Sequence, residues 1–426
     1  MSDRPATRVV VAGALLLAAC GGAAREEPAA SVELGTLREL ATPAVPGSGE
    51  PNLAAGPDGS VYLSWIEPLP DSGHALRFAA REPGGAWTEP RTIAQGRGWF
   101  VNWADFPAVL AFADGALAAH WLQRNGTGTY AYEVRLALSR DGGRTWSAGT
   151  VPHRDGTATE HGFVSLFPWD GERAGLVWLD GRKTGGHGAH EGTAPGAMAL
   201  MQTTVAADGA LGPEVVLDPR VCDCCQTSAA RAGDALVVAY RDRSAEEVRD
   251  VATVRYVGGR WSDPAIVAAD GWVINGCPVN GPAIAADGAR VAVAWFSAPE
   301  EKGRVQVAFS SDSGASYGAP VRVDDGRPIG RVDVVLLTDG DALVSWIEQA
   351  APGAEVRVRT VAPSGRRGPA LTVAPSSEAR SSGFPRLERS GAEVVVAWRD
   401  AADPPRVRSG VIALGSGLSS ELYGKP

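Results

Sequence analysis

The sequence lacks the features that mark several common classes of protein. Its 40 Lys and Arg residues are outnumbered by 49 Asp and Glu, and they are scattered through the chain rather than gathered in a basic stripe. A formal charge of −9 with no such stripe leaves nothing to neutralise the phosphates of a nucleic acid, so we expect no nucleic-acid partner. The glycine-rich phosphate loop is also missing.

A long membrane-spanning run is missing from the N-terminal region as well. The apolar stretch over residues 9–19 follows Arg4 and Arg8, is too short to cross a bilayer, and has the length of a secretory signal core. It ends in Leu17-Ala18-Ala19-Cys20-Gly21, which resembles a bacterial lipobox. That resemblance implies a signal peptide over residues 1–19, lipidation of Cys20 and a flexible tether over residues 20–31. We therefore expect an envelope protein anchored by lipid alone; an ordinary signal peptide with an incidental cysteine is the alternative.

What the chain does contain favours an all-β fold. Apolar residues make up 44% of the 426 positions, enough for a large core, and 53 Gly and 30 Pro are spread throughout. This composition is typical of many short strands joined by tight turns.

An internal repeat gives the architecture. A strand, a tight turn and a second strand ending in an aromatic residue recur about every 50 to 60 residues, the length of one four-stranded propeller blade. The seven aromatic residues are Trp65, Trp121, Trp178, Tyr240, Trp295, Trp346 and Trp398. The spacing predicts a propeller of four-stranded antiparallel sheets over residues 32–416, with seven blades or, alternatively, six. Residues 417–426 then form a C-terminal tail.

The last repeat is short of one strand. Residues 384–414 supply only about three strands, so we expect residues 32–40 to add the missing outer strand and close the ring. Closure of this kind removes a sheet edge that would otherwise invite aggregation.

Two turns carry a resemblance to a known family. Both match the pattern S-x-D-x-G-x-[ST]-[WY], the Asp box of the sialidase superfamily, and the chain therefore resembles that superfamily. Their pattern residues are Ser139, Asp141, Gly143 and Trp146 in one turn and Ser310, Asp312, Gly314 and Tyr317 in the other. The resemblance implies that these residues are structural and lie on the face of the propeller opposite the active site.

The topology of a propeller predicts which loops share the opposite face, which we call the upper face. It should carry the loops that precede each innermost strand and those that connect the second and third strands of each blade. The residue two positions after the repeat aromatic belongs to this face and is a carboxylate in five of seven repeats, namely Glu67, Asp180, Asp242, Glu348 and Asp400. We expect a partial ring of acids around the mouth of the channel, and a ligand site there.

Arginines follow several of these acids. The anion-binding candidates are Arg182, Arg241, Arg243, Arg331, Arg386 and Arg399, and the acid candidates are Asp180, Asp242 and Asp400. The charged segment over residues 240–250 is the densest polar stretch. Salt bridges that cap strand ends, and a solvated charged loop, are the structural alternatives.

The cysteines form a separate cluster. Cys222, Cys224 and Cys225 precede the fourth innermost strand and Cys277 precedes the fifth, so all four should be neighbours on the upper face. Two disulfides, one of them joining Cys277 to the cluster, are one interpretation for an exported chain. A thiolate site for zinc or copper is the other, and His161, His187 and His190 are further candidate ligands. No other cofactor is expected.

The sialidase resemblance also implies an arginine triad, a Tyr–Glu nucleophile pair and an Asp acid/base. The sequence departs from this pattern, because it has no Arg-Ile-Pro motif before the first Asp box and no tyrosine in the final blades before Tyr423. Tyr240 with Glu246 or Glu247 is the remaining candidate pair. We expect a monomeric, envelope-anchored propeller that binds a glycan or small anionic ligand and, if active, hydrolyses it as an exo-α-sialidase-like glycoside hydrolase. A non-catalytic binding or assembly propeller and a thiolate–metal protein are the alternatives.

Overall fold

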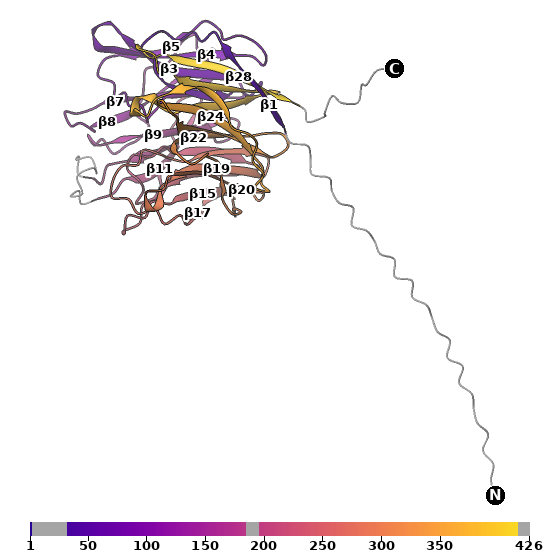
Figure 1. The fold of residues 1–426 in the computed structure, drawn as a ribbon. Helices are drawn as coiled ribbons and strands as arrows, with labels where there is room; N and C mark the ends of the chain where they lie inside the picture. The colour runs from indigo at the N-terminus through magenta and orange to yellow at the C-terminus, as the bar shows by residue number, and fades with distance from the viewer. Residues whose placement is uncertain (2–31, 185–195, 416–426) are drawn as a thin grey trace, which may run out of the picture.

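The chain folds into seven antiparallel sheets arranged as the blades of a propeller, which confirms the predicted class and the count of seven (Figure 1). The computed structural model describes Met1, residues 32–184 and residues 196–415. The predicted signal peptide, Cys20, the tether, His187, His190 and the tail over residues 417–426 lie outside the described residues. Among the described residues, no helix has the length and apolar character needed to span a bilayer.

The first three blades follow the chain in order. Blade 1 contains β2 (Gly49–Ala55), β3 (Val61–Leu69), β4 (Gly73–Arg81) and β5 (Arg91–Gly96). Blade 2 contains β6 (Ala108–Ala111), β7 (Leu117–Arg124) and β8 (Tyr132–Ser139), and a single bridge between Leu136 and Thr150 stands in for its fourth strand. Blade 3 contains β9 (His161–Pro168), β10 (Arg173–Asp180), β11 (Ala199–Ala206) and β12 (Val215–Asp218).

The next three blades repeat the plan. Blade 4 contains β13 (Ser228–Ala232), β14 (Ala235–Arg241) and β15 (Val251–Val257), with its outer edge divided between β16 (Arg260–Trp261) and β17 (Ala265–Ala268). Blade 5 contains β18 (Ala283–Asp287), β19 (Arg290–Ser297), β20 (Arg304–Ser310) and β21 (Val321–Arg322). Blade 6 contains β22 (Pro328–Leu336), β23 (Ala342–Gln349), β24 (Ala354–Val361) and β25 (Leu371–Ser376). Short 3-10 helices occupy Pro70–Ser72, Pro299–Glu301 and Arg380–Ser382.

The seventh blade closes the ring as predicted. Its three inner strands are β26 (Arg386–Ser390), β27 (Glu393–Arg399) and β28 (Val407–Gly415), and β1 (Glu33–Leu40) pairs antiparallel with β28. The register places Leu37 opposite Ile412 and Glu33 opposite Gly415. Figure 1 shows the indigo strand β1 beside the yellow strand β28, so the two ends of the described chain meet in one sheet.

The turns that match the Asp-box pattern are built as their residue types predict. Asp141 accepts backbone N–H bonds from Arg144 and Thr145 at 3.0 and 2.9 Å, and the Ser139 hydroxyl accepts one from Gly143 at 2.8 Å. Gly143 has a φ of 81°, a conformation that favours glycine, and a Cβ there would meet the ring of Phe78 in the neighbouring blade at 2.3 Å. The second turn has equivalent bonds. The Ser310 hydroxyl accepts the backbone N–H of Gly314, and Asp312 accepts that of Ser316, both at 2.9 Å.

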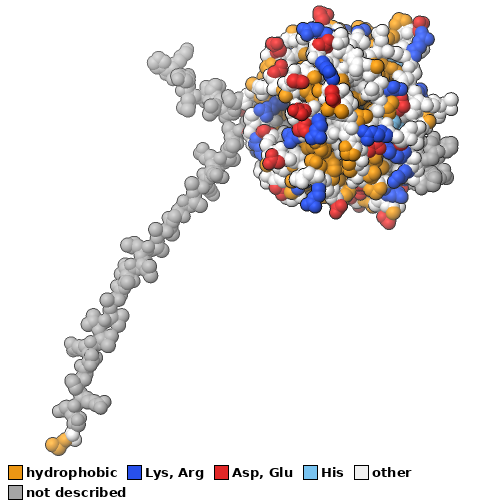
Figure 2. Space-filling model, turned by 180° about the vertical axis from the view of Figure 1, so that it is seen from behind, with side chains coloured by type: hydrophobic (Ala, Val, Ile, Leu, Met, Phe, Trp, Pro, Cys, Tyr) orange, Lys and Arg blue, Asp and Glu red, His pale blue; other side chains and the backbone are white. Residues whose placement is uncertain are grey.

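The outer surface carries both signs of charge. Figure 2 shows Lys and Arg side chains interspersed with Asp and Glu over the side that it displays, with apolar side chains between them. The core lies instead between neighbouring blades, where the repeat tryptophans Trp65, Trp178, Trp295 and Trp346 are fully buried.

Candidate functional site

The upper face is defined by the starts of the seven innermost strands. A cavity of about 500 Å³ runs along the axis between these strands, with lining residues from all seven blades. Its polar residues include Asp333, Arg386 and Glu388 near the axis. The residues just before the inner strands therefore surround the upper mouth of this channel.

The predicted ring of acids does not line the mouth. Instead, Glu67, Asp180 and Glu348 are buried and each accepts a hydrogen bond from the indole of its own repeat tryptophan, at 2.7, 2.8 and 2.6 Å. A buried indole N–H needs an acceptor, and a carboxylate two residues along the same strand supplies it. The repetition of these acids thus reflects repeat packing.

The predicted nucleophile pair is also corrected. The Tyr240 hydroxyl donates to Asp218 at 2.6 Å, and burial and this carboxylate raise the pKa of the phenol far above its usual value. Glu247 accepts from Arg243, and Glu246 is exposed. Tyr240 is therefore a packed structural residue, paired with neither glutamate.

The remaining acid candidates are held by their own loops. Asp242 forms a backbone bridge with Val221 and is half-buried; burial and the charge of Asp218 raise the pKa of its carboxyl. Asp400 accepts the backbone N–H of Arg406 at 2.8 Å and so shapes the turn that follows β27. Asp180, Asp242 and Asp400 lie at the ends of the second strands of three different blades, blades 3, 4 and 7.

Four of the six arginine candidates form hydrogen bonds to groups of the protein itself. Arg182 forms a bidentate salt bridge with Asp180, with both hydrogen bonds at 2.7 Å, and Arg243 binds Asp223 at 2.8 Å. Arg241 donates to three main-chain carbonyl groups, and Arg399 donates to the carbonyl of Ser381. For Arg182 and Arg243 the salt-bridge alternative describes what the structure shows.

The other two arginines stand at the mouth of the channel among aromatic rings. Arg331 lies 4.8 Å from the ring centre of Trp103, which itself stacks on Phe384 at 5.9 Å. Arg386 lies 4.7 Å from the ring centre of Phe106, which also contacts Phe384. We call these five residues the aromatic mouth.

The charge of Arg331 is not balanced by a carboxylate. Its Nη1 donates to the carbonyl oxygens of Ala379 and Gly383, and among the described residues it forms no ion pair. Burial, together with the charge of Arg380, lowers its pKa to about 10, so it stays charged at neutral pH. Near it, Arg386 faces Asp333 at 3.3 Å, and burial raises the pKa of Glu388 to about 7. The aromatic mouth therefore combines a charged guanidinium, only 4% exposed, with aromatic rings.

A buried acid cluster lies beside the mouth, in loops that precede innermost strands and that were therefore expected on the upper face; the sequence did not identify its residues. The Tyr132 hydroxyl donates to Glu160 at 2.8 Å, and Asp105 Oδ2 accepts the backbone N–H of Phe163 at 2.7 Å. A Cβ on Gly162 would lie 2.2 Å from Asp105 Oδ2 and 3.0 Å from the Tyr132 hydroxyl, so glycine lets these groups approach. Burial raises the pKa of Asp105 to about 7 and that of Glu160 to about 8.

His161 belongs to a charge network. His153 and His161 stack at 3.9 Å and both contact Asp155, at 2.8 and 3.2 Å. Burial opposes the charged form of His161, but Asp155 and Asp180 outweigh it and raise its pKa. One ligand atom from each of these three side chains lies within 4.8 Å of the others, a spacing that would suit a metal ion.

The cysteines gather as predicted. Cys224 and Cys277 form a disulfide across the two adjacent loops, while Cys222 and Cys225 are buried free thiols. Burial opposes ionisation of Cys222, but its hydrogen bond with Cys225 and the charges of Arg249 and Arg241 lower the pKa of its thiol to about 7. The loops are locked together by Gln226, which donates to the Ala104 carbonyl at 2.6 Å and accepts the Gly281 N–H at 2.9 Å.

Comparisons with known proteins place this geometry in context. No family model matches the sequence, and no curated protein matches it. Among solved structures, an ulvan lyase of the PL25 polysaccharide lyases, bound to -[GlcA(1-4)Rha3S]-, aligns with a TM-score of 0.56 at 13% identity, over 89% of this chain and 96% of the lyase. Another polysaccharide lyase aligns with a TM-score of 0.52 at 10% identity, over 86% and 90% of the two chains.

Sialidases are also among the structural neighbours. The NanB sialidase from Streptococcus pneumoniae aligns with a TM-score of 0.40 at 11% identity, over 91% of this chain and 69% of the sialidase. At these identities the likeness defines a fold, and the sialidase score is too low to add to it. The chain is a seven-bladed β-propeller, and it shares that fold with carbohydrate-active enzymes.

Proposed function

We propose that the protein is an envelope-anchored propeller that binds an anionic carbohydrate at the aromatic mouth. The observation that carries the proposal is the uncompensated guanidinium of Arg331 stacked on Trp103 at the channel entrance. Aromatic rings pack against the C–H face of a sugar, and a guanidinium binds a carboxylate or sulfate through two parallel hydrogen bonds. An anionic sugar offers both groups at once, and the saccharide bound to the ulvan lyase contains glucuronate.

The place where the chain enters the propeller supports an orientation in which the aromatic mouth points away from the membrane. Glu33 pairs with Gly415 at the end of β28, on the side of the ring opposite the upper face. An anchor at Cys20 would therefore join the propeller from below. The aromatic mouth would face away from the membrane, where glycans outside the bilayer can reach it.

Calorimetric titration with oligosaccharides that end in glucuronate, in sialic acid or in a neutral sugar tests this function. We expect the anionic ligands to bind at least about tenfold more tightly than their neutral counterparts, the equivalent of about 1.4 kcal/mol. Arg331→Gln should abolish that preference, and the exposed Arg380→Gln, which leaves packing intact, should weaken it several-fold. Arg173→Gln is the matched control, because Arg173 pairs with Asp170 in an exposed turn of the opposite face. Equal affinity for neutral and anionic sugars would contradict the proposal.

Carbohydrate cleavage is a second candidate function, favoured by the cluster of Asp105, Tyr132 and Glu160. A tyrosine bonded to a glutamate beside an aspartic acid offers a nucleophile and two carboxyl groups for proton transfer. All three side chains are buried, with Phe100 stacked on Tyr132 at 3.8 Å, so substrate contact requires the segment over residues 99–105 to move.

Turnover of fluorogenic sialosides and aryl glycosides tests cleavage. Glu160→Gln and Asp105→Asn should each lower the rate by at least about a hundredfold, the usual loss on removing a general acid or base. Asp242→Asn should leave it unchanged. If the wild type turns over no member of the panel, cleavage of these substrates is excluded and binding alone remains.

A further inference from the structure

Independently of carbohydrate binding, we propose that Cys222 and Cys225 bind one Cu(I) ion between their sulfur atoms, within the loop that the Cys224–Cys277 disulfide fixes. Binding replaces two thiol protons with the metal: two R–SH groups and Cu⁺ give a Cu(SR)₂⁻ unit and release two H⁺. The step involves no oxidation or reduction, and it leaves the disulfide intact.

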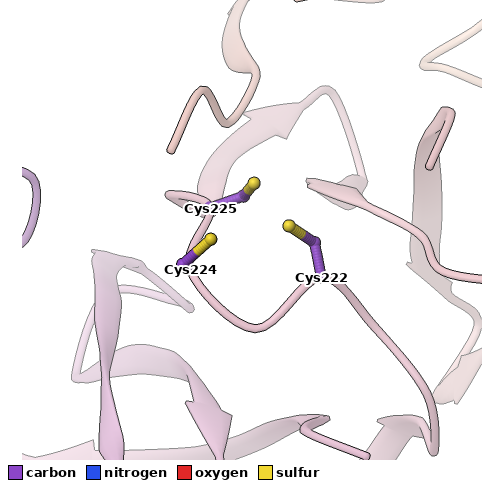
Figure 3. A group of neighbouring side chains, drawn as sticks. All are labelled: Cys222, Cys224 and Cys225. Carbon is purple, nitrogen blue, oxygen red and sulfur yellow. The ribbon is translucent and has the colours of Figure 1, made fainter. Parts of the chain in front are cut away.

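The sulfur positions suit a shared ion. Cys222 and Cys225 are 1% and 2% exposed, and the sulfur atoms of Cys222, Cys224 and Cys225 all lie within 4.8 Å of one another. Figure 3 shows the three side chains arranged around a common centre, on one turn of the loop. With metal–sulfur bonds of about 2.3 Å, two sulfurs on one ion are at most about 4.6 Å apart, so little rearrangement is needed.

The donor set selects the metal. Because Cys224 is in a disulfide, the cluster offers two thiols, whereas a structural zinc site takes four ligands. Soft thiolate donors favour Cu(I), a closed-shell ion that two sulfurs satisfy in a near-linear arrangement. The intervening Asp223 does not add a third ligand, since both of its carboxylate oxygens bind Arg243, at 3.0 and 2.8 Å.

The surrounding charge fits the anionic Cu(SR)₂⁻ unit. Arg241 is 1% exposed and donates only to the main-chain oxygens of Arg249, Asn280 and Phe296, with no carboxylate partner among the described residues. A buried cation without a counter-charge is costly. The backbone carbonyl of Arg241 accepts a hydrogen bond from the Cys222 N–H. Arg249 Nη1 lies 3.5 Å from the Cys222 sulfur. The metal–thiolate unit would supply the missing negative charge.

The shell around the sulfurs is already fixed. The Gln226 bridge and the disulfide hold the two loops together from either side. Outer contacts of this kind orient metal ligands before the ion arrives.

Anaerobic titration of the disulfide-intact chain with Cu(I), in competition with a chromogenic Cu(I) chelator, tests the site. We expect one ion per chain, and X-ray absorption should show sulfur ligands alone. Cys222→Ser and Cys225→Ser should each abolish stoichiometric binding, while the double variant Cys224→Ser/Cys277→Ser keeps one ion. Far-UV circular dichroism confirms that each variant is folded, and mass analysis confirms the remaining disulfide in the two single variants.

Four outcomes would overturn the proposal. They are the absence of free thiols in the anaerobically isolated chain, no Cu(I) uptake when two thiols are present, uptake that survives in both single variants, and loss of uptake in the folded double variant. Stoichiometric zinc in the reduced chain without Cu(I) binding would replace the two-sulfur site with a four-thiolate one. None of these results depends on whether a carbohydrate binds.

Discussion

At the scale of single residues, Asp105 and Glu160 are buried acids of the upper face that form no ion pair with an arginine among the described residues. Burial is the main cause of the raised pKa of each group, with Tyr132 partly offsetting it at Glu160. The charges of Asp105 and Asp223 raise the pKa of Glu160 further, and His161 lowers it. Such groups are neutral at mildly acidic pH and ionise only at a cost to the fold.

This cost predicts how stability depends on pH. The folded pKa of Glu160, about 8, lies above its unfolded value of 4.5, so the folded state holds a proton that the unfolded state has lost. The contribution of Glu160 to the free energy of unfolding is therefore fully present below about pH 4.5. It declines as the pH rises toward 8, by at most about 1.4 kcal/mol per pH unit. Asp105 and His161, whose folded pKa values are also raised, act in the same direction.

Glu160→Gln should flatten this decline, because glutamine accepts the Tyr132 hydrogen bond without ionising. Urea unfolding at pH 5.5 and pH 8 measures the effect, and the exposed Glu172→Gln is the matched control. An unchanged difference between the two pH values in Glu160→Gln would show that Glu160 is not protonated in the folded protein.

At the scale of elements, the loops over residues 222–226 and 277–281 form one unit. A Cβ on Gly281 would lie 2.1 Å from the Gln226 carbonyl oxygen and 2.4 Å from its nitrogen, so only glycine allows the loops to meet. A Cβ on Gly276, in the same segment, would meet nothing closer than Ile274 at 3.9 Å.

Gly281→Ala should therefore lower the free energy of unfolding by about 1–3 kcal/mol, the usual range for forced overpacking. Gly276→Ala should stay within about 0.5 kcal/mol of the wild type. Chemical denaturation of both variants checks the difference. Equal stability of the two would mean that the loop contact does not constrain the fold.

The elements were also where sequence reasoning succeeded most. The spacing of aromatic residues predicts the blades, and the short last repeat predicts the pairing of β1 with β28, because both follow from local strand and turn patterns. Residues such as Trp103, Phe384 and Glu160 could not be singled out in this way. Their role depends on which side chains converge from different blades, and a repeat pattern does not contain that information. The same limit explains why a carboxylate repeated in five of seven blades looked like a ligand ring, although three of its members bond to tryptophans.

At the scale of the whole molecule, the ring brings segments that are far apart in sequence to one entrance. Trp103, Arg331 and Phe384 come from three separate parts of the chain and meet above the axial cavity. The cysteine loops and the buried acid cluster lie on the same face. One closed ring of sheets therefore carries both the proposed carbohydrate site and, separately, the proposed thiolate site.

A crystal structure of the protein in complex with a glucuronate-terminated oligosaccharide would test the proposed carbohydrate site most directly. We expect a sugar ring stacked on the aromatic mouth, with its carboxylate in hydrogen-bond contact with the Arg331 guanidinium. An oligosaccharide bound elsewhere on the molecule, without contact to Arg331 or Trp103, would rule out the proposed site.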